Sequence, residues 1–141
     1  MTVRRRRCTT CHRSIIAQGP ARIIEAARTL EGAEPAEEYI AKLENSRRKT
    51  DLDRLAVVVI VLEEYARLGR LRIPLELNQL RDDLWEIKAG VIRLPFYEPN
   101  DSSHVSVVTR LTSGFVKKQR NTPQGEIRRG IWVMGQDRQQ I

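Results

Sequence analysis

Apolar side chains in the first half of the chain follow a helical spacing twice. After Pro35 an apolar residue recurs every three or four positions, and acids occupy the first turn, where the helix dipole favours negative charge. Between Asp51 and Gly69 the same spacing persists over about five turns. The run Ala56–Leu62 is rich in β-branched residues, which favours a strand, but the longer repeat favours a helix. We therefore predict an antiparallel hairpin of two helices, the first over 35–46, with the wide apolar face of the second packed against a sheet.

From Leu84 onward the pattern changes to the alternation of strands, in which every second side chain points to the same face. The first strand, 84–88, carries Glu86 and Lys88 on its polar face. In the strand that follows, Arg93, Pro95 and Tyr97 share the face opposite to its apolar residues. The remaining elements are a turn at 89–90, a second strand over 91–97, a loop over 98–103 and a third strand over 105–112.

Two further segments complete the predicted fold. The segment 21–30 is ambiguous, since its alanines permit a helix and its length permits a first strand. A closing helix begins at Pro123, where Thr122 is expected to cap the free amides and proline to occupy the first helical position. The predicted class is α+β, with an N-terminal strand and helix hairpin packed on a small antiparallel sheet and a C-terminal helix.

The composition fits one globular domain. At 141 residues, with 40% hydrophobic and 30% charged residues, the chain can bury one proper core. We expect a single domain over 21–141, preceded by a basic and flexible extension over 1–20 that closes on Gly19-Pro20. No apolar run approaches the roughly 20 residues that a membrane helix needs. No signal-peptide core follows the N-terminal arginines. We expect a cytoplasmic protein with no membrane partner.

The net charge of +7 is concentrated in two places. Residues 1–30 hold seven cations and one acid, and the segment Arg110–Arg129 holds six cations and only Glu126. Within the second patch, Lys117, Lys118 and Arg120 follow a β-branched run and precede the closing helix. Such patches suit polyanions, and a basic loop beside a helix N-terminus is suited to phosphate. An ordinary solvated turn remains the alternative.

The two cysteines open several interpretations of the N-terminal segment. Cys8-Thr9-Thr10-Cys11-His12 matches the pattern of c-type haem attachment, but that attachment needs export. Cys8, Cys11 and His12 are also part of a zinc ligand set, which His104 or a second molecule would have to complete. A loose tail without a metal is the third interpretation. The spacing makes no disulfide framework and fits a reducing compartment.

Several of these motifs together resemble a known family. Leu84–Lys88, Arg93 within its strand, and the run from Gly114-Phe115-Val116-Lys117-Lys118 through Thr122-Pro123 to Ile127 resemble the RelE/HigB superfamily of type II toxin–antitoxin ribonucleases. The nearest likeness is to its phage-derived HigB-like branch. The segment 32–40 resembles the entry into the helix hairpin of that branch, and the resemblance covers about residues 21–135.

The resemblance implies a sheet that carries RNA on one face and helices on the other. Members of the family cut mRNA on translating ribosomes and are held inactive by a cognate antitoxin, here expected to be of the helix-turn-helix kind. By position, Lys88, Arg93, Lys117 and Lys118 resemble the basic residues of the family site and are the expected catalytic set. We further expect three residues to bind RNA, namely Arg120, Arg110 and Tyr97.

RNA cleavage by the ribose 2′-hydroxyl needs a base, an acid and positive charge around the phosphorane, and no cofactor is expected. Arg93 suits the phosphate because its planar fork binds two oxygens at once, while the lysines serve as point charges. The chain departs from the family pattern at several positions. These are Glu86 for a basic residue, Ser113 for histidine, Asn121 for lysine, and Pro95 within a central strand.

Three functions therefore compete. The first is a toxin of a type II toxin–antitoxin system, a metal-free mRNA endoribonuclease that inhibits translation. The second is a non-catalytic nucleic-acid-binding regulator of phage or bacterial origin on the same scaffold. The third is an interaction module that uses the basic tail and a cysteine and histidine zinc site.

Overall fold

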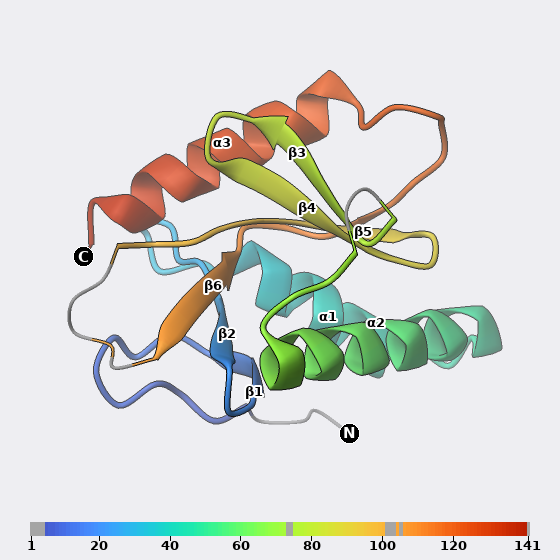
Figure 1. Ribbon diagram of the computed structural model, residues 1–141. Coiled ribbons are helices and arrows are strands. Elements are labelled where there is room, and N and C mark those ends of the chain that lie inside the picture. The colour runs from blue at the N-terminus through green and yellow to red at the C-terminus, as the bar shows by residue number, and fades with distance from the viewer. Residues whose placement is uncertain (1–4, 73–74, 101–103, 105, 141) are drawn as a thin grey trace.

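A mixed β-sheet separates two helical layers (Figure 1). The computed structural model describes residues 5–72, 75–100, 104 and 106–140. A helix hairpin covers one face of the sheet, and the C-terminal helix lies on the other face. The helices are α1 (Pro35–Glu44), α2 (Lys49–Leu68) and α3 (Gln124–Arg138). The α+β class, the helix hairpin and the closing helix are confirmed.

The strands run in the order β1-β2-β6-β5-β4-β3, and the short β7 pairs with β5 beyond the end of β6. All pairs are antiparallel except β2 and β6, which run parallel. The small antiparallel sheet that the sequence predicted is not what forms, because the N-terminal strands join the meander through this parallel pair. The strands are β1 (Ile15–Gln18), β2 (Arg22–Ala26), β3 (Leu77–Arg81), β4 (Leu84–Ala89), β5 (Ile92–Tyr97), β6 (Val107–Leu111) and β7 (Phe115–Val116).

Most local elements follow the sequence pattern. The helix α2 ends where expected, at Gly69 with φ of 76°, and the Gly69 amide donates to the Tyr65 carbonyl. The ambiguous segment 21–30 contains strand β2. The strand predicted over 105–112 corresponds to β6, although Val105 lies outside the described residues, as do 101–103 of the predicted loop. The pattern predicted no element where β3 forms.

The described part of the N-terminal segment, 5–20, packs against the rest of the domain, where the sequence predicted a flexible extension. It contains β1, which pairs with β2, and it contributes the buried residues Cys8 and Arg13. Arg5 also forms ion pairs with Glu37 and Glu44 of α1. These contacts pack the segment against both the sheet and the helix hairpin.

The main core lies between the helix hairpin and the sheet. Its central members include Ile40, Val58, Leu62, Ile87 and Leu94. A smaller apolar cluster lies under α3 on the opposite face, formed by Ala27, Tyr97, Val133 and Met134.

Only one side of α2 is buried, so the prediction that its whole wide apolar face packs on the sheet is wrong in part. Ile60 and Leu68 on that helix remain 63% and 45% exposed.

Pro95 lies at a point in the sheet that tolerates the absence of a backbone N–H group. Within a strand the N–H and C=O of one residue point to the same side, and the Pro95 carbonyl accepts from the Thr112 amide. Thr112 belongs to the short break between β6 and β7. The side of β5 on which Pro95 lacks an N–H therefore faces the break between β6 and β7. No residue of a strand lies there to accept a hydrogen bond from it.

Gly114, in the same break, packs directly against an aromatic ring. A Cβ atom at this position would lie 2.5 Å from Cδ2 and 3.0 Å from Cγ of Tyr39. We expect Gly114→Ala to lower the free energy of unfolding by about 1–3 kcal/mol through overpacking. Gly135→Ala is the matched control, because nothing lies within 4 Å of its added methyl group. In an exposed helix interior this control should raise stability by up to about 1 kcal/mol. Urea unfolding measures the stability of both variants. Equal changes in their free energies of unfolding would contradict the close packing of Gly114 against Tyr39.

Candidate functional site

Three cations from two segments border one hollow on the α3 side of the sheet. Lys88 comes from β4, and Lys117 and Arg120 from the segment after β7. The hollow has a volume of about 280 Å³, and the first turn of α3 forms part of its rim through Gln124 and Ile127. The Lys117 amide donates to the Val91 carbonyl at 2.8 Å, which holds the start of this segment beside the β4–β5 turn. The arrangement concentrates positive charge at an open surface.

A buried carboxylate fixes the far end of the same segment. The Thr122 hydroxyl lies 2.6 and 2.9 Å from the two carboxylate oxygens of Glu86, and Glu86 is only 1% exposed. Thr122 therefore does not cap α3 as predicted; Pro123 is the N-cap residue, and it makes no side-chain cap hydrogen bond. Glu86, where the family pattern has a basic residue, binds the basic segment to β4.

Arg93 does not line the hollow. Its Nη1 donates to the carbonyls of Gly90 at 2.6 Å and Ile92 at 3.1 Å, and the residue is 8% exposed. Burial lowers the pKa of the Arg93 guanidinium below its usual range, an effect that the charge of Glu86 opposes. Arg93 shares a sheet face with Lys88, its register partner on β4, but its guanidinium holds the β4–β5 turn.

The two neighbouring lysines of the basic segment face different surfaces. Lys118 is exposed and lines a separate depression of about 430 Å³ together with Tyr39 and Arg129. Of the departures from the family pattern, Asn121 lines the basic hollow and Ser113 is fully buried between β6 and β7. The structure thus brings together Lys88, Lys117 and Arg120, and it separates them from Lys118.

Arg110 and Tyr97, which were expected to bind RNA, are buried instead. Both have 0% exposure beneath α3, and both contact Asp137 in the last turn of that helix. Arg110 donates to Glu25 and to Asp137, at 3.1 Å in each case, and the Tyr97 hydroxyl donates to Asp137. Arg13 adds a further ion pair to Asp137 at 2.6 Å. Neither Arg110 nor Tyr97 reaches solvent, so neither can contact RNA in this structure.

Burial and neighbouring charges shift the pKa values of these groups. Burial alone lowers the pKa of Arg110, but the charges of Asp137 and Glu25 outweigh it and raise the pKa above the usual range. Burial and the charge of Asp137 also raise the pKa of the Tyr97 hydroxyl. Arg110 is therefore charged, as is Glu25, whose pKa the Arg110 charge lowers against the effect of burial, and Tyr97 is neutral.

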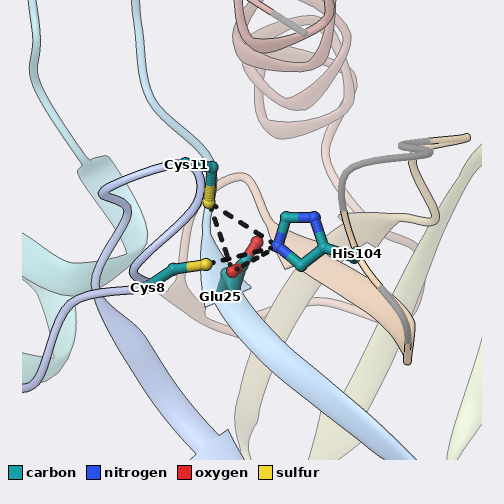
Figure 2. Close-up of side chains that lie close together, drawn as sticks. All are labelled: Cys8, Cys11, Glu25 and His104. Atoms are coloured by element: carbon teal, nitrogen blue, oxygen red, sulfur yellow. Dashed lines mark hydrogen bonds and ion pairs between the residues drawn. The ribbon is translucent and has the colours of Figure 1, made fainter.

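A second cluster forms around the cysteines (Figure 2). The side chains of Cys8, Cys11, Glu25 and His104 meet, with one candidate ligand atom from each within 4.8 Å of the others. His12, the third member of the predicted zinc set, is exposed with φ of 63° and is not part of the cluster. Glu25 from β2 takes its place, and His104, which precedes β6, is the residue that the sequence indicated as able to complete the set.

The thiols and the imidazole of this cluster are perturbed in different ways. Burial and the charge of Glu25 outweigh a backbone hydrogen bond at Arg13 and raise the pKa of Cys11 to about 11. Burial also acts to raise the pKa of Cys8, but hydrogen bonds from Thr10 and Cys11 outweigh it and lower that pKa. Burial lowers the pKa of His104, and Glu25 reverses this so that the net direction is upward.

Sequence reasoning missed Glu25 and Asp137. Glu25 lies in a segment whose pattern permitted strand or helix, and its partners come from positions 8, 11, 104 and 110. The signal available was an acid among the apolar residues 23–27, which indicates a buried partner without identifying it.

Comparison with known proteins adds no further assignment, since no family model and no curated protein matches the chain. Among the residues that the structure describes, no helix combines the length and apolar character that a membrane crossing requires.

The buried network makes a strong prediction for Asp137. We expect Asp137→Asn to lower the free energy of unfolding by about 3–5 kcal/mol, because it leaves the buried charges of Arg110 and Arg13 without their shared carboxylate. Asp83→Asn is the control, since Asp83 pairs with Arg138 at an exposed site and should change stability by no more than about 0.5 kcal/mol. Urea unfolding of the two variants measures the contrast. A small effect at Asp137 would show that the network contributes little.

Proposed function

We propose that this chain is an RNA-binding endoribonuclease of the RelE/HigB kind, acting as the toxin of a type II toxin–antitoxin system. The observation that carries the proposal is the open hollow bordered by Lys88, Lys117 and Arg120. The element order supports it: two N-terminal strands are followed by a helix hairpin, a run of antiparallel strands and a C-terminal helix, and the resemblance implies the same order with one N-terminal strand.

The site is suited to a phosphate of single-stranded RNA. Positively charged grooves follow the nucleic-acid backbone, and fixed cations stabilise the charge that develops on a phosphorane. Lys88 and Lys117 come from segments tied to the sheet, and Arg120 lies on the exposed segment between them and α3. We assign the phosphate to these three residues. Arg93, expected to be catalytic, becomes a residue that positions the β4–β5 turn.

We assign the proton acceptor for the 2′-hydroxyl to Glu86, which is 1% exposed and becomes accessible only if the basic segment moves. It is the one carboxylate among the residues that border the hollow, and its Thr122 partner belongs to the basic segment itself. Movement of that segment on RNA binding would release the carboxylate from the Thr122 hydroxyl.

The second candidate, RNA binding without cleavage, is favoured by one observation. The Arg93 guanidinium donates to two backbone carbonyls and so is not directed at the phosphate position. Glu86→Gln separates the two candidates, because glutamine can still accept from Thr122 but is a very weak base. In the enzyme, this variant should bind RNA normally and lose cleavage.

Substitution of the hollow lysines tests the phosphate assignment. We expect Lys117→Ala and Lys88→Ala each to lower the cleavage rate by about 10²–10³-fold, as for the loss of one preorganised electrostatic contact. Each should also reduce the slope of log affinity against log salt concentration by about 0.7. Lys118→Ala, which faces the other depression, should change the rate by less than tenfold. Lys42→Ala, exposed at the end of α1, is the matched control.

Growth arrest gives the test in cells. Induced expression should stop growth and cleave mRNA on ribosomes, and co-expression of a neighbouring small helix-turn-helix protein should restore growth. If the wild type and the double variant Lys88→Ala/Lys117→Ala are equally harmless and neither binds RNA, the proposal fails.

A further inference from the structure

Three distant parts of the chain bring four metal-binding side chains to one point. Cys8 and Cys11 come from the N-terminal segment, Glu25 from the buried strand β2, and His104 from the chain before β6. The segments approach from different sides and direct their side chains inward, as Figure 2 shows. Cys8 and Glu25 are buried, the side chain of His104 is only 3% exposed, and Cys11 is partly buried. The cluster is thus enclosed, unlike a set of acids on a surface.

Four of the six separations between these ligand atoms are close to those of a coordination tetrahedron, and the other two are below 4.8 Å. His104 Nε2 lies 3.4 Å from Cys8 Sγ, 3.7 Å from Cys11 Sγ and 3.1 Å from Glu25 Oε2. Cys11 Sγ lies 3.3 Å from the same Glu25 oxygen. Zinc bonds of about 2.3 Å to sulfur and about 2.0–2.1 Å to nitrogen or oxygen place neighbouring ligands roughly 3.3–3.8 Å apart. Three of the four separations fall within this range, and the fourth, between His104 and Glu25, is about 0.2 Å shorter than its lower limit.

The second oxygen of Glu25 is already held. Arg110 Nε donates to Glu25 Oε1 at 3.1 Å, which leaves Oε2 directed at the cysteines and His104. Partners of this kind orient the ligands of a metal and are a regular part of a metal centre. Arg110 in turn is fixed by Asp137. The carboxylate is oriented by the fold itself, before any ion binds.

We propose that Cys8, Cys11, Glu25 and His104 bind one zinc ion in a structural site. Thiolate, imidazole and carboxylate are all zinc ligands, and a set of four protein ligands closes the tetrahedron without a position for substrate. The ion joins the N-terminal segment to β2 and to the chain that enters β6. It lies apart from the basic hollow, none of whose lining residues belongs to the cluster.

Metal content of the purified full chain is the first test. Expressed with zinc and passed through a desalting column, the wild type should retain about one zinc ion per chain, as a closed four-ligand site does. His104→Ala should weaken zinc affinity by more than about 100-fold. This is a larger loss than is typical when a residue that only hydrogen-bonds to a zinc ligand is replaced. His12→Ala is the matched control, an exposed neighbour of Cys11 outside the cluster, and it should bind zinc as the wild type does.

Cobalt substitution shows the geometry directly. The wild type and His12→Ala should give the visible absorption of tetrahedral cobalt with thiolate ligands, and His104→Cys, which restores a fourth ligand, should give it with a shifted maximum. Lys117→Ala should bind cobalt normally, so that failure of the RNA site and failure of the metal site remain distinguishable. A folded wild type with no stoichiometric zinc and no tetrahedral cobalt spectrum would overturn the proposal. Detection of a Cys8–Cys11 disulfide in the protein purified without oxidant would also overturn it.

Discussion

The ion pairs of Arg110 hold together parts of the chain that share no local pattern. Its side chain projects from β6, near the centre of the sheet, and bonds to Glu25 of β2 and to Asp137 at the end of α3. Asp137 also binds Arg13, so the N-terminal segment joins the same network. A buried charge without its partner is strongly destabilising. The parallel pairing of β2 with β6, the docking of α3 and the folding of the N-terminal segment are therefore tied to one another.

This network also determines which surfaces are open. The last turn of α3 covers Tyr97 and Arg110, whereas its first turn borders the hollow at Lys88 and Lys117. The face of the sheet that was expected to carry RNA is thus divided into a closed, charged interior and an open, basic end. The contrast explains how residues on one face of adjacent strands acquire different roles. Tyr97 packs and donates to a carboxylate, while Lys88 contributes to a basic surface.

The sequence predicted the elements whose pattern is local and failed where the structure depends on distant contacts. The helix α2 and strand β4 follow from apolar spacing alone. The burial of Arg110 does not, because its partners lie at positions 25 and 137 and come together only through the parallel strand pair and α3. The sequence also did not indicate that Lys117 and Lys118 line different hollows, because this depends on the path of the chain after β7.

The same dependence on distant contacts explains why the sequence indicated only part of the proposed zinc site. The Cys8 and Cys11 spacing is a local signal, but His12, next to it, points away, and Glu25 completes the set only after β1 pairs with β2. In the proposed site, zinc would displace two protons from its ligands, so the net charge of the buried cluster would not change when the ion binds. Arg110 continues to balance Glu25, and Arg13 continues to balance Asp137. The interior that the arginines stabilise can therefore accept the ion without a further buried counter-charge, which is the electrostatic condition for a metal site at this place in the fold.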